Sequence, residues 1–278
     1  MLDLPAYLRR IGFSGAADTD LATLRQIAQR HPQSIAFENL DAFSGQAVSL
    51  VAQDVERKLV VEGRGGWCFE QNLLLGNALR ALGFTVVDLA ARVIWNRPPD
   101  ALTARTHRLL LVEVEGRQWL MDAGFGGQTL TGVLELDDDA PQSTPHEAFR
   151  LRRLGAERLL ESLIRGEWLP LYRFDLQPQF AVDFEAANYQ LAHDPASHFT
   201  HAVTVSRIAV DGRLVLRGHP QHGVELGFHS LHGESQRREL RETAEILQIL
   251  REVFDLPVDG LPPLRERFDH LLALSPRR

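Results

Sequence analysis

The hydrophobic residues of this chain change their spacing close to Gly83, and this change constrains the fold more than any other feature. Before Gly83, apolar residues recur at intervals of three and four, as on one face of a helix. After it, short runs rich in valine, leucine and isoleucine are separated by turn residues, which is typical of strands. The pattern therefore predicts an α+β fold with the helices first.

Three helices are predicted before Gly83. The first begins behind the capping candidates Thr19 and Asp20 and ends at Pro32, and a second, short helix covers residues 55–60. The third begins at Cys68 and carries an apolar stripe that ends at Gly83, because glycine is favoured just past a helix end. This third helix matters most, since it places the lone cysteine at a helix start.

The rest of the chain is predicted to hold two β-containing units. Strands are expected at 85–95, 108–114, 118–121, 149–154 and 168–174, with a turn at Glu115-Gly116 and an acidic loop at 137–145. They indicate a small antiparallel barrel or sandwich. A hairpin around Asp211-Gly212 and an amphipathic helix over 238–254 follow. We predict a helical domain at 1–83, a β-barrel domain at 84–190 and a mixed α/β lid at 191–278.

Charge and cysteine content exclude several classes of protein. The 278 residues include 30 basic and 37 acidic side chains, a net charge of −7 that disfavours nucleic-acid binding. Neither a secretory leader nor a long apolar span is evident, so a cytoplasmic protein without membrane association is expected. Cys68 is the single cysteine, which excludes an intrachain disulfide and a cysteine-rich metal site.

Cys68 is either a buried apolar residue or a reactive thiol, and its surroundings favour the thiol. It follows the diglycine Gly65-Gly66 and begins a helix, where unpaired N–H groups and the helix dipole stabilise an anion. Arg64 is expected to add to this effect. The thiolate should therefore form below the ordinary pKa of about 8.5.

His107 and Asp122 are candidates for the base and the acid that such a nucleophile needs. If Glu115 and Gly116 are the two central residues of a hairpin, Asp122 lies opposite Leu109, whose side chain shares a face with His107. The imidazole and the carboxylate are then diagonal neighbours, about 7–8 Å apart at Cβ. One hydrogen bond between the two side chains can span this gap.

With these residues in place, the sequence resembles the arylamine N-acetyltransferase family. The matching segments are Ala36-Phe37-Glu38-Asn39-Leu40, Arg64-Gly65-Gly66-Trp67-Cys68-Phe69-Glu70-Gln71-Asn72, Thr106-His107-Arg108-Leu109-Leu110-Leu111 and Asp122-Ala123-Gly124-Phe125-Gly126-Gly127. They lie in order over the first half of the chain. The resemblance implies a cysteine-protease-like core and a triad of Cys68, His107 and Asp122. It also implies acetyl-coenzyme A as the donor, arylamines, arylhydrazines or arylhydroxylamines as acceptors, and no metal.

The resemblance also implies residues that bind the two substrates. Phe37, Phe125 and Phe199 are expected to form aromatic walls for a flat acceptor, with Thr106 beside them. Thr103 and Gly126 are expected near coenzyme A, Thr103 and Thr106 lying in the loop before His107. The protein is expected to be a monomer or a homodimer.

Other readings of the same residues stay open at this point. The triad would equally serve a hydrolase of the cysteine-protease or transglutaminase type, or an amide synthase that uses a tethered acyl group. A binding module with an inert Cys68 is the alternative outside catalysis. Four histidines, His219, His222, His229 and His232, crowd a region expected to be a loop, but they lack the spacing of a metal site.

Overall fold

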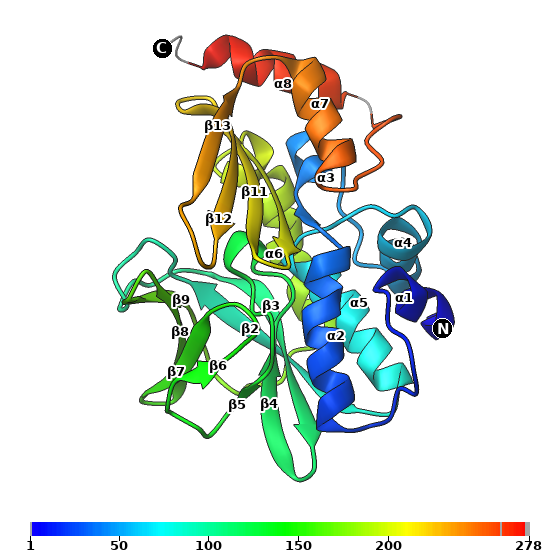
Figure 1. The fold of residues 1–278 in the computed structure, drawn as a ribbon, viewed down its shortest axis with the longest axis vertical. Helices are drawn as coiled ribbons and strands as arrows, with labels where there is room; N and C mark the ends of the chain where they lie inside the picture. Colours follow the sequence, from blue (N-terminus) through cyan, green and yellow to red (C-terminus); the bar gives the residue numbers. More distant parts are fainter. Residues whose placement is uncertain (1, 262, 276–278) are drawn as a thin grey trace.

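A computed structural model describes residues 2–261 and 263–275 of the chain. Its N-terminal helices pack against an antiparallel sheet that curls into a nearly closed barrel, and a second sheet with two C-terminal helices lies above both (Figure 1). The prediction of an α+β fold with helices, a barrel and a C-terminal α/β unit is confirmed. The division into three domains at 83 and 190 stays a prediction, and residue 190 lies inside a helix, α6 (Ala181–His193).

The N-terminal region is helical, as predicted. Its elements are α1 (Leu4–Arg10), α2 (Leu21–Ser34), the short strand β1 (Phe37–Glu38), α3 (Leu40–Phe43), α4 (Ala52–Glu56), the π-helical turn η1 (Arg57–Val61) and α5 (Cys68–Ala81). Asp20 caps α2 by accepting the N–H of Thr23. The predicted end of α2 at Pro32 is wrong. The helix continues to Ser34, because a proline in the last turn removes only one hydrogen bond.

The barrel is one eight-stranded antiparallel sheet in the order β5-β4-β3-β2-β9-β8-β7-β6. Its strands are β2 (Thr85–Val93), β3 (Arg105–Val114), β4 (Arg117–Met121), β5 (Leu134–Glu135), β6 (Gln142–Ser143), β7 (Ala148–Leu154), β8 (Glu157–Ile164) and β9 (Glu167–Phe174). The two edge strands meet through the side chain of Gln142, which accepts the N–H and donates to the carbonyl of Glu135. This side chain bridges the gap between the sheet's ends.

The register predicted for the β3–β4 hairpin is confirmed. Leu110 lies opposite Met121, and the turn residues Glu115 and Gly116 have φ of 54° and 71°, as a tight two-residue turn requires. The hydrophobic face of β3 packs against α5, so the hairpin and the helix that begins at Cys68 share one core. Two sequence segments predicted to carry reactive groups are thereby brought together.

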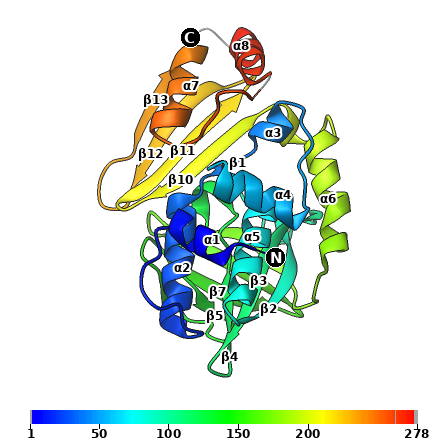
Figure 2. The same ribbon diagram turned by 90° about the vertical axis from the view of Figure 1, so that its right-hand side faces the viewer.

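The second sheet has the order β1-β10-β11-β12-β13 and carries α7 (Thr243–Glu252) and α8 (Leu264–Leu274) (Figure 2). Its other strands are β10 (Val203–Ala209), β11 (Gly212–His219), β12 (Gly223–Ser230) and β13 (Gln236–Leu240). Phe37 pairs with Ser206, so a strand from the N-terminal region forms one edge of this sheet. The C-terminal sheet thus reaches the same region as α5.

Two predictions for the C-terminal part are wrong in detail. The turn of the β10–β11 hairpin consists of Val210 and Asp211, while Gly212 lies in the ladder opposite Ala209. A Cβ on Gly212 would lie 2.5 Å from the carbonyl oxygen of His229, so this glycine serves a close strand contact. The predicted helix over 238–254 begins only at Thr243, because its first residues pair with β12 as an edge strand.

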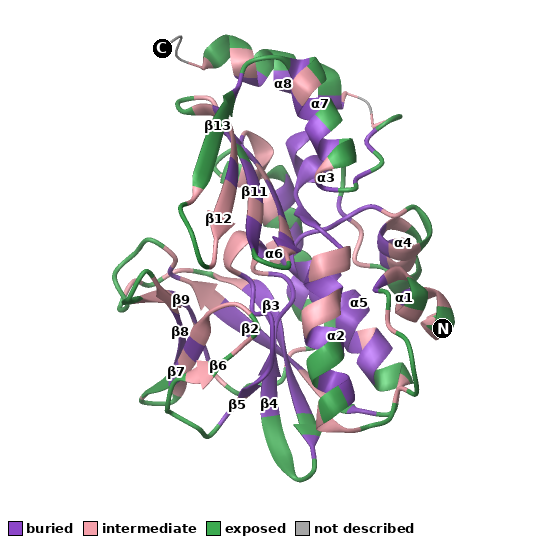
Figure 3. Ribbon diagram, viewed as in Figure 1, coloured by how far each residue is buried: buried purple, intermediate pink, exposed green. Residues whose placement is uncertain are grey.

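Burial follows the packing of these three parts. The strand β3 and the start of α5 are largely buried, whereas β13 and the tip of the β3–β4 hairpin are exposed (Figure 3). Of the helices within residues 2–261 and 263–275, none combines the length and the apolar character needed to cross a bilayer. The cytoplasmic location stays a prediction.

Candidate active site

Cys68 is the first residue of α5 and is 8% exposed. The segment before it passes very close to other backbone. A Cβ on Gly65 would lie 2.2 Å from the carbonyl oxygen of Ala36, and a Cβ on Gly124 would lie 2.6 Å from the Cα of Cys68. Only glycine lacks the Cβ that would collide at these two positions. Gly65 therefore allows the chain before α5 to pack beside β1, and Gly124 allows the segment after β4 to pack against the start of α5.

His107 on β3 and Asp122, directly after β4, form the predicted pair. Nε2 of the imidazole lies 2.7 Å from Oδ2 of the carboxylate, and the two residues are 2% and 1% exposed. The sulfur of Cys68 lies near enough to the same imidazole to raise its pKa. Because Asp122 occupies Nε2, Nδ1 is the ring nitrogen left to exchange a proton with the sulfur. The structure therefore brings the three predicted side chains into one region, with a direct hydrogen bond between His107 and Asp122.

The charge of His107 is set by two opposing effects. Burial lowers the pKa of the imidazole, but the Asp122 carboxylate and, to a smaller extent, Cys68 raise it to about 10. Burial also raises the pKa of Asp122, and the adjoining imidazole, with hydrogen bonds from Asn72 and Gly124, lowers it below its ordinary value. A buried imidazolium–carboxylate pair next to the sulfur is the favoured state.

A β-bulge lies directly beside this pair. Ala91 is opposite His107 and Arg92 is opposite Arg105, so Thr106 has no partner on β2. Bulges re-aim the chain next to active sites. Here the carbonyl oxygen of Thr106 comes to 3.7 Å from the sulfur of Cys68. The prediction that Thr106 lies in the loop before His107 is therefore wrong, because it belongs to β3.

Asn72 is a member of the site that sequence reasoning missed. Its side chain is fully buried; Nδ2 donates to Oδ1 of Asp122 at 2.9 Å and to the carbonyl of Arg108 at 2.6 Å, and Oδ1 accepts the N–H of Ala123 at 3.1 Å. Asn72 follows Cys68 by four residues and so lies on the same face of α5. The four-residue spacing from Cys68 was the one feature of the sequence that could have indicated that Asn72 belongs to the site.

A second buried cluster, called here the ion network, lies under the opposite face of the helix start. It consists of Glu38, Asp41, Lys58, Arg64 and Glu70. Arg64 donates to Glu38 at 2.7 Å and to Asp41 at 2.8 Å, so its guanidinium is committed to these carboxylates. The prediction that Arg64 stabilises the thiolate is not supported by this geometry.

Glu70 connects the ion network to the nucleophile's helix. One carboxylate oxygen accepts from Lys58 at 2.7 Å and the other accepts the N–H of Trp67 at 3.1 Å. The second bond satisfies a free donor at the helix start, as in one half of a capping box. Burial raises the pKa of Glu70 to about 7, against the lowering effect of Lys58.

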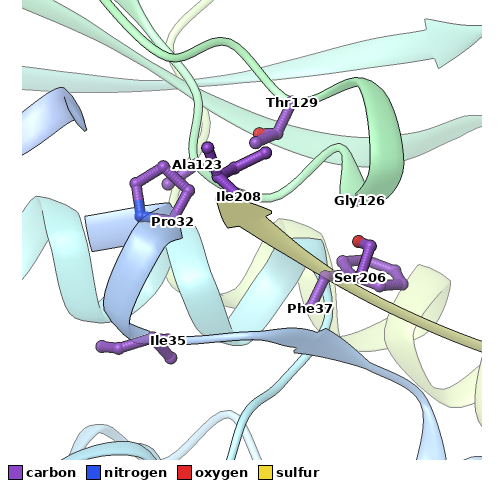
Figure 4. A pocket seen from close by; sticks show the side chains of 8 residues that line it. All are labelled: Pro32, Ile35, Phe37, Ala123, Gly126, Thr129, Ser206 and Ile208. Carbon is purple, nitrogen blue, oxygen red and sulfur yellow. The ribbon is translucent and has the colours of Figure 1, made fainter. Parts of the chain in front are cut away.

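Phe37 and Gly126 face one another across a small cavity between β1, β10 and the segment after β4 (Figure 4). A Cβ on Gly126 would lie 3.5 Å from the Phe37 ring. The cavity measures about 10 Å³, which is room for one water molecule and far less than an aromatic ring needs. Its polar lining includes Thr129 and Ser206. Acceptor and coenzyme A binding by Phe37 and Gly126 stay predictions.

The other predicted binding residues differ in how near they lie to the triad. Phe125 packs edge-to-face on the imidazole of His107, with ring centroids 5.4 Å apart. Phe199 packs against Trp67, the residue before Cys68, at 5.5 Å. Thr103 donates its hydroxyl proton to the carbonyl of Val93. Its proposed contact with coenzyme A has no support from this arrangement and stays a prediction.

Tyr172, on β9, is a further neighbour that the sequence did not indicate. Its ring centroid lies 5.0 Å from that of His107 and 5.4 Å from that of Phe125. Burial and the nearby Asp122 carboxylate raise the pKa of the phenol well above 10, so it stays neutral. The pairing of β2 with β9 brings Tyr172 to the site. No pattern in the sequence near Tyr172 predicts that pairing, because the two strands are far apart along the chain.

Of the four histidines predicted to lie in a loop, His219 ends β11 and His229 belongs to β12, whereas His222 and His232 lie in the turns on either side of β12. His201, His219 and His222 approach one another with ring centroids 5.0 to 5.8 Å apart. Among residues 2–261 and 263–275, no three histidine, cysteine, aspartate or glutamate side chains are arranged to hold a metal ion.

Known proteins resemble this chain over most of its length. A family model described as N-acetyltransferase matches residues 20–261. The arylamine N-acetyltransferase of Escherichia coli K12 is 42% identical over 91% of this chain and 88% of its own length. The solved structure of the Mycobacterium smegmatis enzyme has a TM-score of 0.91 at 38% identity, covering 98% of this chain and 99% of that one. That of Mycobacterium marinum arylamine N-acetyltransferase in complex with CoA has a TM-score of 0.89 at 35% identity, with 97% and 98% covered. With matches of this extent, the chain belongs to the arylamine N-acetyltransferase family.

Proposed function

We propose that this protein transfers an acetyl group from acetyl-coenzyme A to arylamines, arylhydrazines and arylhydroxylamines through an acetyl-Cys68 intermediate. The acceptor atom is the nitrogen or, for a hydroxylamine, the oxygen. The observation that carries the proposal is the buried hydrogen bond between His107 and Asp122, which lies beside the sulfur of Cys68. A nucleophile, a base and an orienting acid in this order are the requirement for acyl transfer through a covalent enzyme.

In the first half-reaction, the sulfur of Cys68 attacks the thioester carbonyl carbon. His107 holds the thiol proton on Nδ1, while its Nε2–H stays bonded to Asp122. The bond between the acetyl carbon and the coenzyme A sulfur breaks, and the leaving thiolate takes the proton from Nδ1. Free backbone N–H groups in the first turn of α5 are placed to stabilise the oxyanion.

In the second half-reaction, the acceptor amine attacks the acetyl carbon of acetyl-Cys68. His107 takes the proton that the amine loses, and the Cys68 sulfur leaves as a thiolate beside the imidazolium. The free enzyme is restored. The aromatic ring of Phe125, which packs against His107, supplies one flat wall for an aromatic acceptor.

The intact mass of the protein after mixing with acetyl-coenzyme A alone tests this proposal. We expect one added acetyl group on Cys68, release of free coenzyme A, and rapid loss of the adduct when an arylamine such as aminosalicylate is added. Double-reciprocal rate plots against the arylamine should be parallel. Cys68→Ala is the control, and it should neither take up acetyl nor catalyse transfer.

The alternatives give different results in the same experiment. A hydrolase would produce acetate without accumulating the adduct, and a binding module with an inert Cys68 would give no adduct. An amide synthase would discriminate against acetyl-coenzyme A in favour of a tethered acyl group. Intersecting plots, or an adduct that amine does not discharge, would contradict the proposed mechanism even if Cys68 were reactive.

A further inference from the structure

Arg213 projects from β11 of the C-terminal sheet toward the segments that follow β4 and precede β7, and it is 2% exposed. Its guanidinium forms a forked ion pair with Glu147, with Nε 2.9 Å from one oxygen and Nη2 2.5 Å from the other. The remaining nitrogen, Nη1, donates to the carbonyl oxygens of Gly127 at 3.1 Å and Thr129 at 3.0 Å. One buried side chain therefore joins the C-terminal sheet to the segment that follows β4.

The carbonyls that Arg213 holds belong to the far half of that segment, residues 125–129. Thr129 folds the segment back on itself, because its hydroxyl donates to the carbonyl of Asp122 at 3.0 Å and accepts the N–H of Phe125 at 3.2 Å. A Cβ on Gly127 would lie 3.1 Å from the side chain of Val215 on β11. The segment is thus packed directly against the C-terminal sheet.

The near half of the segment has a different anchor. Asn72 from α5 bonds to Asp122 and to the N–H of Ala123, and the N–H of Gly124 bonds to Asp122. These bonds fix the carboxylate of the triad acid from α5, whereas the link from the C-terminal sheet through Thr129 reaches only the main-chain carbonyl of Asp122. The segment therefore has two anchors, one for the acid and one for the residues around Phe125.

We infer that Arg213 is a positioning residue for the acceptor step, acting through Gly127 and Thr129 to hold Phe125 against the ring of His107. The inference rests on the proposed function, in which Phe125 lines the acceptor site. It assigns the C-terminal sheet a part in the second half-reaction, although Arg213 itself touches no reacting atom. The first half-reaction depends on the triad, which Asn72 anchors independently.

The arrangement requires arginine specifically. A planar guanidinium can bond both oxygens of Glu147 and still present a nitrogen to two carbonyls, whereas an ammonium group is a single point charge on a flexible stem. Arg213→Lys therefore keeps the charge opposite Glu147 but loses the fixed geometry. This variant therefore distinguishes a role in positioning the segment 125–129 from a role in neutralising the charge of Glu147.

The test measures the two half-reactions separately, by quenched intact-protein mass. For Arg213→Lys we expect acetyl-Cys68 to form from acetyl-coenzyme A near the wild-type rate. Discharge by low concentrations of aminosalicylate should slow by about tenfold to a hundredfold, the range expected when a reacting partner is misplaced by about 1 Å. Arg207→Lys is the matched control, since Arg207 lies in the same sheet but donates to Gln33 on α2. Both of its half-reactions should be unchanged.

Each other outcome overturns the inference. Equal slowing of both steps would mean that Arg213 supports the whole site, and unchanged discharge would make its role purely structural. If Arg213→Lys does not fold, the double variant Arg213→Met with Glu147→Leu removes both buried charges and should show the same split. A wild-type protein that never forms acetyl-Cys68 would instead contradict the proposed function. This result is distinguishable, because failure of the inference alone leaves acetyl-Cys68 formation in the wild type intact.

Discussion

Two buried charged clusters flank the start of α5, and they differ in what they leave unpaired. In the ion network, all six carboxylate oxygens have a partner. The oxygens of Glu38 accept from Arg64 and Leu40, and those of Glu70 accept from Lys58 and Trp67. Those of Asp41 accept from Arg64 and form an ion pair with Lys58. In the triad cluster, Asp122 is equally satisfied, but His107 keeps one ring nitrogen for the sulfur.

This difference indicates that the ion network stabilises the fold and that the triad cluster carries the reaction. A network whose carboxylate oxygens are all engaged by Arg64, Lys58 and backbone N–H groups is suited to positioning the helix. The triad cluster concentrates its one exchangeable proton between His107 and Cys68, where an acyl group can be taken up and released. Substitutions in the two clusters should therefore have different readouts, stability for the ion network and rate for the triad cluster.

The largest expected effect is on rate, in Asp122→Asn. An amide cannot hold His107 as an imidazolium and favours the wrong tautomer, so acetyl transfer should fall on the order of 10³- to 10⁴-fold. Rates of acetyl-Cys68 formation measure this loss, and circular dichroism checks that the fold persists. Retention of more than about a tenth of the rate would show that Asp122 merely ends a strand, since a triad acid contributes far more than that.

The ion network should respond in stability. Lys58→Met leaves Asp41 and Glu70 without their shared cation, and breaking a buried pair on one side costs about 3–5 kcal/mol in the free energy of unfolding. Urea unfolding measures this. Arg57→Met is the control, because Arg57 is an exposed neighbour whose ion pair with Asp54 is worth about 0–1 kcal/mol. At a temperature where Lys58→Met is folded, a large loss in acetyl-Cys68 formation would contradict the division between the clusters.

The sequence predicted much of the triad cluster and little of the ion network, for a physical reason. A two-residue turn and strand alternation determine where His107 and Asp122 point, so local rules were sufficient. The ion network joins segments from Glu38 to Glu70 through long side chains, and no local period specifies those contacts. The prediction that Arg64 stabilises the Cys68 thiolate rests on nearness in sequence alone. Nearness in sequence does not show which way a side chain points, and the Arg64 side chain points to Glu38 and Asp41.

The same limit explains the other errors. Residues 238–240 belong to the segment predicted as a helix, but an edge strand with exposed arginines, such as Arg237 and Arg238, has a similar composition. Gly212 was assigned to a turn, although its role is the close approach of β12. In both cases the partner strand decides the structure, and the partner lies outside the local pattern.

Asn72 offers a smaller effect that combines both readouts. Asn72→Leu removes a donor to Asp122 and leaves the buried N–H of Ala123 unpaired, which should cost about 1–3 kcal/mol in stability. The loss of a group that orients a catalytic residue should also slow acetyl transfer by about 10- to 100-fold. Asn77→Leu, at a half-buried position of the same helix, should do neither. A stability loss with an unchanged rate would place Asn72 outside the triad cluster.

The last predicted effect is a difference in pH dependence between the clusters. The pKa of His107 is raised from 6.5 to about 10, so the folded state binds this proton more tightly than the unfolded state. Its contribution to stability is present below pH 6.5 and is lost as the pH rises through 10. The pKa of Glu70 is raised from 4.5 to about 7, so its contribution is lost in the lower window, between pH 4.5 and about 7.

Urea unfolding across the pH range tests this separation. Above about pH 7, the stability of the wild type relative to Asp122→Asn should fall with pH, with a limiting slope of about 1.4 kcal/mol per pH unit for one proton. Glu70→Gln should leave that slope intact and change only the lower window. A stability difference between wild type and Asp122→Asn that stays constant with pH would mean that His107 is not charged in the folded protein. The imidazolium next to Cys68 would then have to form only when acetyl-coenzyme A binds.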